Sequence, residues 1–455
     1  MNVSEKRSVF SLALLYAMRM LGLFMILPVF VLLGDELDGS NGFLIGIAIG
    51  AYGLTQALLQ VPFGMLSDRF GRKKMIIVGL LIFCLGSVVA ATSESIYGVI
   101  AGRLLQGAGA IASVLMALLS DLTTEDSRTK AMAVVGMSIG LSFSVALVAG
   151  PLVAGFFGLS GIFWLTAIFA LVGIAMVVFV VPTPVATHAH RDTRAVRGEF
   201  FELLKNPDLL RLDIGIFLLH LILTALFIAV PLSLVNDVQL DRQQHWWVYL
   251  SVMVTAFFAM VPFIIVGEKK RKIKSVFAGA VLQLSVGSIL LVWVDNSLAA
   301  MWGALFVFFM AFNLLEASLP SLVSKQAPAG ARGTAMGIYS TSQFFGAFLG
   351  GAVGGWVLSN WGGDVIYYTS AALGAIWFLI ALTMRTPSYS TSKTLKLNAL
   401  LSESEAAVVS DELFEVQGVE DVVIVIEEQT VYLKIDKAHL DENALNSFRY
   451  IAKAV

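Results

Sequence analysis

Three ionisable side chains lie inside long apolar stretches, where a charge is costly. Glu316 interrupts one such stretch, and a carboxyl group removed from water is more stable in its protonated form. Arg103 lies about eight residues into another, so it must pair, snorkel to the surface or face water. His220 is a weaker candidate, because a single histidine in a helix is more often satisfied by a neighbour. Reversible protonation is the chemistry that Glu316 and, more weakly, His220 predict.

Other polar side chains in apolar stretches could line a cavity for a solute. An ion pair between Glu316 and Arg19 is an open alternative for these two residues, and it would be structural only. The cavity candidates are Arg19, Gln56, Asn313 and Gln343.

A second set of charged residues runs from Gly64 to Lys74, between two apolar segments. Nothing so polar can lie in hydrocarbon, which predicts a tight loop on the cytoplasmic side, where Lys and Arg are retained. Gly64 permits close helix approach, and Gly71 permits a sharp turn. Asp68 is a lone acid beside several bases, able to pair across a helix interface or to lie at a helix N-terminus.

The composition places these residues in a polytopic membrane protein. Of 455 residues, 58% are hydrophobic and 14% are charged, and the mean hydropathy is +0.84, well above soluble proteins. A lone cysteine, Cys84, excludes an intramolecular disulfide and a Cys-based metal site. We expect no cofactor and no metal. Arg19 and the length of the first apolar run argue against a cleaved signal peptide.

About twelve apolar segments are long enough to cross a bilayer. Basic residues gather in the connections on one side and acids in those on the other, which predicts that both termini are cytoplasmic. The expected spans are 9–33, 42–66, 74–92, 95–121, 130–157, 160–182, 209–235, 245–267, 273–292, 297–324, 331–359 and 364–385.

The spans form two related halves, 1–182 and 209–385, joined by a cytoplasmic linker, 183–208. Val61-Pro62-Phe63 recurs as Val261-Pro262-Phe263, and the acid Asp68 is matched by Glu268 before another basic run. The second copy has lost the glycines, so only the first has the full pattern. Such duplicated carriers hold their substrate near the midplane, between the repeats.

The composition changes after Arg385. Residues 386–394 read as a linker, and 395–455 as a small cytoplasmic domain of order β-α-β-β-α, with a first strand at 395–401 and a capping box from Ser402 to Glu405. Acids outnumber bases between Glu403 and Glu442, which argues against nucleic acid or anionic lipid as a partner. We expect this domain to contact the basic loop Lys269–Lys274 or the loop after Pro182.

The stretch from Gly64 to Lys73 resembles motif A of the major facilitator superfamily, through Gly64, Leu66, Asp68, Arg69, Gly71, Arg72 and Lys73. The resemblance implies that this segment locks the cytoplasmic side closed in one state, with Asp121 as a partner. Arg103 to Gly109 resembles motif B, whose arginine is associated with proton transfer. Gly150, Pro151 and Gly155 resemble motif C of proton-coupled exporters, although tight helix packing explains small residues equally well.

The family resemblance also implies which helices line the cavity. In this superfamily spans one, four, seven and ten do so, which covers Arg19, Arg103, His220, Asn313 and Glu316. The C-terminal region resembles the ferredoxin-like heavy-metal-associated domain. Its metal-binding C-x-x-C is absent here, because the corresponding loop is Asn398 to Glu403.

The chain is thus identified as an all-α membrane protein of the drug:proton antiporter branch, with a small α+β domain. The resemblance implies a secondary transporter and not an enzyme, in which protons drive efflux of an amphipathic solute by alternating access. Two alternatives are a proton-coupled importer of a sugar or organic acid and a membrane sensor that signals through its C-terminal domain. We expect a monomer in the bacterial inner membrane, with a small molecule, protons and lipid as partners.

Overall fold

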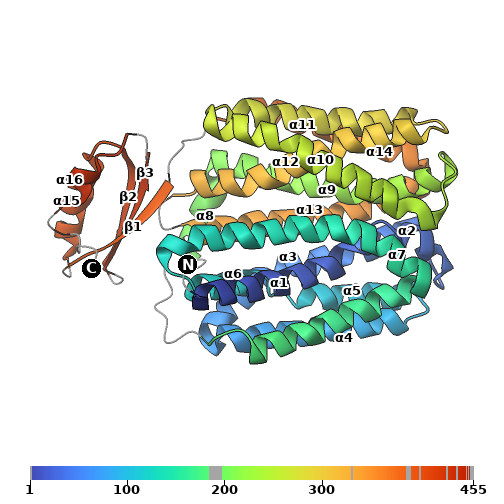
Figure 1. Ribbon diagram of the computed structural model, residues 1–455, viewed down its shortest axis with the longest axis horizontal. Helices are drawn as coiled ribbons and strands as arrows, with labels where there is room; N and C mark the ends of the chain where they lie inside the picture. Colours follow the sequence, from blue (N-terminus) through green and yellow to red (C-terminus); the bar gives the residue numbers. More distant parts are fainter. Residues whose placement is uncertain are drawn as a thin grey trace.

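The computed structural model describes residues 3–183, 197–328, 331–385, 391–398, 401–426, 429–436, 439–446, 448 and 450. Figure 1 shows a bundle of long helices that run along a common direction, and a small sheet with two helices beyond one end of the bundle. The described start of the chain lies at that same end. Residues 184–196 of the expected linker and 386–390 of the second one lie outside the described residues.

The first half of the bundle contains helices α1 to α7. Two expected spans are interrupted. α1 ends at Phe24, because Pro28 has no amide hydrogen to continue the ladder to the Phe24 carbonyl, and the fourth span breaks at Gly109. The bounds are α1 Val3–Phe24, α2 Phe30–Leu33, η1 Gly34–Glu36, α3 Gly42–Phe70, α4 Arg72–Thr92, α5 Ile96–Ala108, α6 Ala112–Asp121 and α7 Glu125–Phe179.

α7 consists of two antiparallel arms. At 55 residues it would extend about 80 Å as one straight helix, against a hydrocarbon thickness of about 30 Å. Its backbone leaves helical geometry at Gly158, with φ 64° and ψ −169°. In the first arm the Ser138 hydroxyl donates to the Ala13 carbonyl and Gly150 meets Met25, so this arm runs parallel to α1. In the second arm Gly173 meets Leu15, and the direction is reversed.

The second half contains α8 to α14. The loop expected before it is partly helical, because α8 lies within it. Asn206 caps α9 by accepting from the amides of Asp208 and Leu209. The bounds are α8 Arg197–Lys205, α9 Pro207–Asn236, η3 Arg242–Gln244, α10 His245–Lys269, α11 Ile273–Leu290, η4 Leu291–Trp293, α12 Leu298–Gln326, α13 Arg332–Trp361 and α14 Gly363–Leu382.

Ten helices among the described residues are long and apolar enough to cross a membrane. The two arms of α7 are counted together in this number, and α13 falls outside it although it has 30 residues. The protein is therefore mostly helical with multiple candidate spans, and the count of twelve stays a prediction.

The bundle has two ends of opposite charge, which we call the basic end and the acidic end. The small domain lies beyond the basic end (Figure 1). The basic end carries Arg69, Arg72, Lys73, Lys74, Lys205, Lys269, Lys270, Arg271, Lys272 and Lys325, and the acidic end carries Asp35, Glu36, Asp38, Glu94, Asp237, Asp241, Asp295 and Asp364.

Glycines bring the two halves together toward the acidic end. α3 and α13 pack so closely there that a Cβ atom at Gly46 would collide with the Gly351 carbonyl oxygen, and one at Gly50 with that of Phe348. Only small residues allow such an approach between helices. The contact closes the space between the halves on this side.

The C-terminal domain is a three-stranded antiparallel sheet of order β1-β3-β2 with two helices. β1 spans Thr391–Lys396, so it begins inside the range expected for the linker. It forms there because Thr391 and its neighbours pair with β3, with Leu395 opposite Val431, and the apolar residues join the domain core. The bounds are β1 Thr391–Lys396, α15 Glu403–Phe414, β2 Val419–Val425, β3 Thr430–Ile435 and α16 Glu442–Asn446.

The capping box expected at the start of α15 is present. The Ser402 hydroxyl accepts from the Glu405 amide, and the Glu405 carboxylate accepts from the Ser402 amide. These donations from the Ser402 backbone and hydroxyl hold the pKa of Glu405 below its ordinary value. The order β-α-β-β-α is confirmed, whereas the ferredoxin-like assignment stays a prediction.

Candidate functional site

A cavity of about 2240 Å³ lies between the two halves. Its lining runs from Gly50 and Tyr52 inside the bundle to Asp68, Arg72 and Lys325 at the basic end. Toward the acidic end the α3–α13 contact closes it. The cavity is therefore accessible from the basic end, beside the C-terminal domain.

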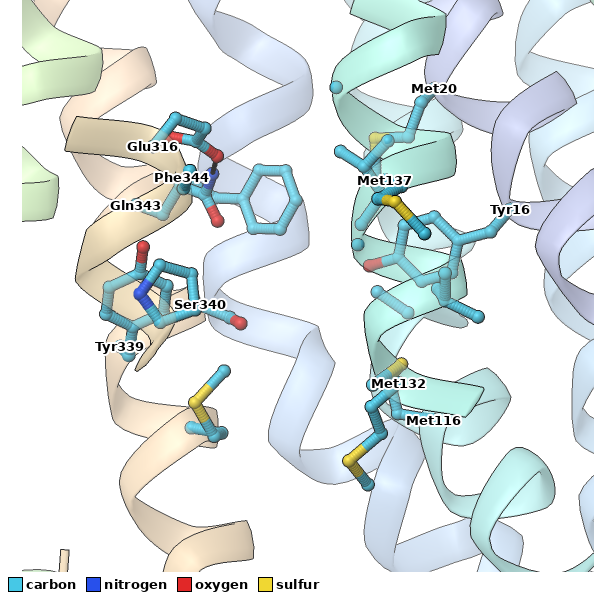
Figure 2. A pocket seen from close by; sticks show the side chains of 18 of the residues that line it. Tyr16, Met20, Met116, Met132, Met137, Glu316, Tyr339, Ser340, Gln343 and Phe344 are labelled. Atoms are coloured by element: carbon cyan, nitrogen blue, oxygen red, sulfur yellow. Dashed lines mark hydrogen bonds between the residues drawn. The ribbon is translucent and has the colours of Figure 1, made fainter. Parts of the chain in front are cut away.

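Figure 2 shows two unlike walls facing each other across this space. Polar groups lie on the wall from the second half, and thioether side chains dominate the opposite wall. The first wall presents Glu316, Tyr339, Ser340 and Gln343, and the second presents Tyr16, Met20, Met116, Met132 and Met137.

Glu316, Gln343 and His220 form one hydrogen-bonded group on the polar wall. The Gln343 amide nitrogen lies 3.2 Å from Glu316 Oε1 and 2.9 Å from His220 Nε2. Since that nitrogen can only donate, His220 Nε2 accepts and Nδ1 carries the proton, 3.3 Å from the Ile216 carbonyl. The geometry therefore makes His220 neutral, and α9, α12 and α13 are joined through one amide.

The second oxygen of Glu316 has no hydrogen-bond donor among the described residues. Glu316 Oε2 is buried without a hydrogen-bond partner, and Nε2 of the neutral His220 ring is 3.9 Å from it. The Glu316 side chain as a whole is 27% exposed and lines the cavity, so the carboxyl group is reachable from the cavity. Asn313, one turn earlier, also has an unpartnered buried amide nitrogen and lines the cavity.

Two residues near this group escaped the sequence analysis. Asp213 is 7% exposed on α9, seven residues before His220 and so on the same helix face. Tyr339 lies one turn before Gln343, with a buried hydroxyl that lacks a partner. An acid within the apolar pattern of α9 was a signal that could have identified Asp213, whereas tyrosines are too common in such helices.

The expected placement of Arg19 and Gln56 on the cavity surface was wrong. Arg19 is 2% exposed and Gln56 is fully buried, and neither lines the cavity. Arg19 Nη2 donates to Gln56 Oε1, at 2.5 Å, and to the Gly109 carbonyl, at 3.0 Å. The break between α5 and α6 takes that carbonyl out of the regular helical ladder, and it accepts from Arg19 as well as from the Ile111 amide. Arg19 is therefore held behind the wall, and its pairing with Glu316 does not occur.

Arg103 is also buried, which removes the snorkelling alternative. Its side chain is 1% exposed. It donates to the carbonyls of Ala48 and Ile49, both at 3.2 Å, and to Gln106 Oε1 at 3.0 Å. These bonds join α5 to α3, and Arg103 still lines the cavity.

The charged segment after Gly64 is helical rather than a loop. α3 continues to Phe70, and the reversal takes place at Gly71 alone, with φ 97°. A helix end can stay ordered here because its charges are paired: Arg72 contacts Asp68 at 2.5 Å and Asp121 at 3.2 Å. Arg72 is only 8% exposed.

Further described contacts of this segment connect it to other elements of the first half. Lys73 Nζ donates to the Val181 carbonyl at 2.9 Å, and the Arg69 guanidinium lies over the Phe70 ring. Gly64 faces Ser113 of α6. The structure thus brings together α3, α4, α6 and the end of α7, with Asp121 in the position that the resemblance implied.

Replacing Gly71 by alanine is expected to destabilise this turn. A positive φ costs a residue with a Cβ about 1–2 kcal/mol, which would lower the thermal midpoint of the purified protein and loosen the Asp68–Arg72 contact. Gly136→Ala is the matched control, since Gly136 has no atom within 4 Å of a Cβ position and no positive φ. Equal midpoints for the two variants would refute the argument.

The second copy of the segment has a different and more exposed arrangement. Lys325 Nζ bonds to both carboxylate oxygens of Glu268 at 2.8 Å, and Glu268 is 43% exposed. Two contacts reach the C-terminal domain: Arg271 to Asp436 at 3.3 Å, and Lys434 Nζ to the Lys325 carbonyl at 2.6 Å.

The motif C residues show close packing at one position. A Cβ at Gly150 would collide with the carbonyl of Met25, just after α1, and Pro151 is accommodated inside the first arm of α7. Gly155 lies at an exposed site near Gln243. The packing explanation therefore applies to Gly150, and a role in coupling stays a prediction.

Comparison with known proteins assigns the class. The family model of the major facilitator superfamily matches residues 12–351 and 212–413, and the chain belongs to this superfamily of membrane transporters. It is 47% identical over 439 residues to the inner membrane transport protein YajR of Escherichia coli K12, covering 96% of this chain and 95% of that protein. The sequence-based resemblance is thereby confirmed, and the chain is an integral multi-pass membrane protein.

Two further similarities agree with the assignment to a family of membrane transporters. Multidrug resistance protein 2 of Bacillus subtilis is 26% identical over 371 residues, which covers 78% of this chain and 90% of that protein. A bacterial homologue of the human lysosomal transporter Spinster, solved in an inward-facing and occupied conformation, superimposes with a TM-score of 0.69 at 11% identity, covering 84% of this chain and 97% of the other. The second similarity concerns the fold alone.

Proposed function

We propose that the protein is a twelve-span, proton-driven exporter that works by alternating access. The observation that carries this proposal is Glu316: an acid on the cavity wall, held on one oxygen by Gln343 and unpartnered on the other. Such a group can bind a proton when the cavity is closed to the cytoplasm and lose it when water enters. The binding and release of this proton would couple proton entry to solute export.

The orientation follows from the charges at the two ends. Basic loops stay in the cytoplasm, so the basic end, both termini and the C-terminal domain are cytoplasmic in this proposal. The cavity then faces inward, toward its solute. The name of the relative YajR favours the inner membrane.

The cavity surface favours an amphipathic solute. Flexible, polarizable methionines adapt to differently shaped apolar molecules, and Met20, Met116, Met132 and Met137 cover one wall. The drug-resistance relative supports the same class. One proton moving through 100 mV supplies about 2.3 kcal/mol, enough for a solute gradient of roughly fiftyfold.

Oriented proteoliposomes test both coupling and direction. Ethidium and tetracycline serve as probes, with an imposed pH gradient of either sign. We expect export toward the acidic compartment that stops when the gradient is collapsed. Transport indifferent to the gradient would overturn the proposal, and uptake alone would favour the importer. Normal transport by a protein truncated after Arg385 would count against the sensor.

We also propose that the C-terminal domain regulates the cycle by docking on the basic end. The contacts of Arg271 with Asp436 and of Lys434 with Lys325 support this, because α10 and α12 move with the second half. The Arg271–Asp436 pair is partly exposed, so it is worth about 0–1 kcal/mol, whereas the Lys434 side chain is buried.

Asp436→Arg is expected to weaken docking, and Arg271→Asp combined with it should restore docking. The measurement is the yield of a bis-maleimide cross-link between cysteines at the exposed residues Lys272 and His439 in a Cys84→Ser background, which leaves Lys325 and Lys434 in place. Asp411→Arg, on the exposed side of α15, is the control and should leave the yield unchanged. No recovery in the double variant would refute the pairing.

A further inference from the structure

Two buried arginines of the first half have no acid to balance them. Arg19 and Arg103 are 2% and 1% exposed. The membrane-spanning stretches of this half, 9–33, 42–66, 75–92, 96–120 and 131–179, contain neither Asp nor Glu. The neighbouring acids Asp68 and Asp121 are already paired with Arg72 at the basic end. Buried charges are normally paired, so this pair lacks a counterion from its own half.

The two guanidinium groups share one aromatic ring. The Arg19 and Arg103 Cζ atoms lie 5.8 Å and 5.3 Å from the centre of the Tyr52 ring. The ring attracts both cations, but it carries no charge that would balance them. Tyr52 and Arg103 line the cavity, and Arg19 lies behind them, so only the Arg103 charge is at the wall itself.

Unused hydrogen-bonding groups gather at the same place. Arg19 Nε and Nη1 have no hydrogen-bond partner among the described residues, and the buried Tyr52 hydroxyl completes no well-formed hydrogen bond either. The Tyr52 hydroxyl lies next to the Arg19 guanidinium. By contrast, all three nitrogens of Arg103 donate to neutral oxygens. The unsatisfied donors are therefore concentrated between Arg19 and Tyr52.

We propose that the Arg19–Tyr52–Arg103 cluster is a buried anion-binding subsite, reached from the transport cavity past Tyr52 and Arg103. It would take a carboxylate or a comparable monovalent anion, which supplies the counterion that the spans of the first half lack and accepts from the donors left open. The anion is either the acidic group of the solute or a free inorganic ion.

This inference deepens the proposed function by naming a chemical feature of the ligand, and its test needs no proton gradient. Full-length protein in a zwitterionic buffer with detergent is unfolded thermally while sodium chloride or sodium benzoate is added in steps, and the Arg19→Gln variant shows how much of the shift comes from screening alone. Binding to the native state raises the midpoint saturably. If no anion binds, the proposal of proton coupling still stands. If transport is not coupled to protons, the proposal of anion binding still stands.

Three variants locate the effect. Arg19→Gln should abolish the saturable rise, Arg19→Lys should retain part of it, and Tyr52→Phe should weaken the apparent affinity roughly tenfold through loss of one bond to a charged group. Arg242→Gln, an exposed arginine at the acidic end, is the control and should respond like the unchanged protein. If Arg19→Gln does not fold, Tyr52→Phe carries the test, because it keeps the ring and both charges.

Saturation by chloride assigns a free ion, and saturation by benzoate alone assigns a carboxylate on the solute. The proposal is overturned if neither anion gives a saturable rise. It is equally overturned if Arg19→Gln and Tyr52→Phe respond with the affinity of the unchanged protein.

Discussion

Glu316→Gln is expected to uncouple solute movement from the proton gradient. The amide is close in shape to the carboxyl group and can still bond to Gln343, but it cannot gain or lose a proton. The charge on this wall therefore no longer changes when the cavity opens to the other side of the membrane. We expect gradient-driven export of ethidium or tetracycline in proteoliposomes to fall at least tenfold. Exchange of the same probe across the membrane without a gradient should persist, because the cavity keeps its shape.

Two other substitutions separate coupling from packing. Asn313→Ala removes a neighbouring polar group of the same helix that cannot titrate, and it should change export by no more than about threefold. Asp213→Asn tests the buried acid on α9 as the alternative proton carrier. Full gradient dependence in Glu316→Gln together with its loss in Asp213→Asn would transfer the role to Asp213.

The sequence predicted the helices better than the contacts between them. Hydropathy placed the apolar segments, since about twenty apolar residues suffice to cross a bilayer. It could not show that the fourth span breaks at Gly109, because Gly109 and Ile111, which lie between α5 and α6, pack closely against Gly79 of α4. Nor could it show that Arg19 would be held by the carbonyl which that break takes out of the helical ladder. These partners come from different helices.

The conformation of the charged segment from Gly64 to Lys74 was also not predictable from the sequence alone. Its charges excluded hydrocarbon and therefore indicated a loop, yet α3 remains helical as far as Phe70. The helical form is stable here because Arg72 pairs with Asp68, one turn before it, and with Asp121 of α6. The turn predicted at Gly71 is present, between α3 and α4. Pairing across helices, which a single sequence does not reveal, decided the conformation.

The two copies of the charged segment are expected to differ strongly in their effect on transport. Asp68→Asn removes one of the two carboxylates that contact the nearly buried Arg72, so that Asp121 remains as the other. A hydrogen bond to a charged group is worth about 1.5–3 kcal/mol. That free energy corresponds to a shift of roughly ten- to a hundredfold in the equilibrium between states. We expect a comparable loss of transport rate.

Glu268→Gln should change the same rate by less than about fivefold. Glu268 meets Lys325 at a largely exposed site, and such surface pairs contribute about 0–1 kcal/mol. Both variants remove one negative charge from the basic end, so a general electrostatic effect would act on them alike. Rates are compared per molecule of folded protein in proteoliposomes. Equal losses would show that net charge matters and that the Asp68–Arg72–Asp121 cluster is no lock, whereas a large loss confined to Asp68→Asn follows only from its buried, doubly paired arginine.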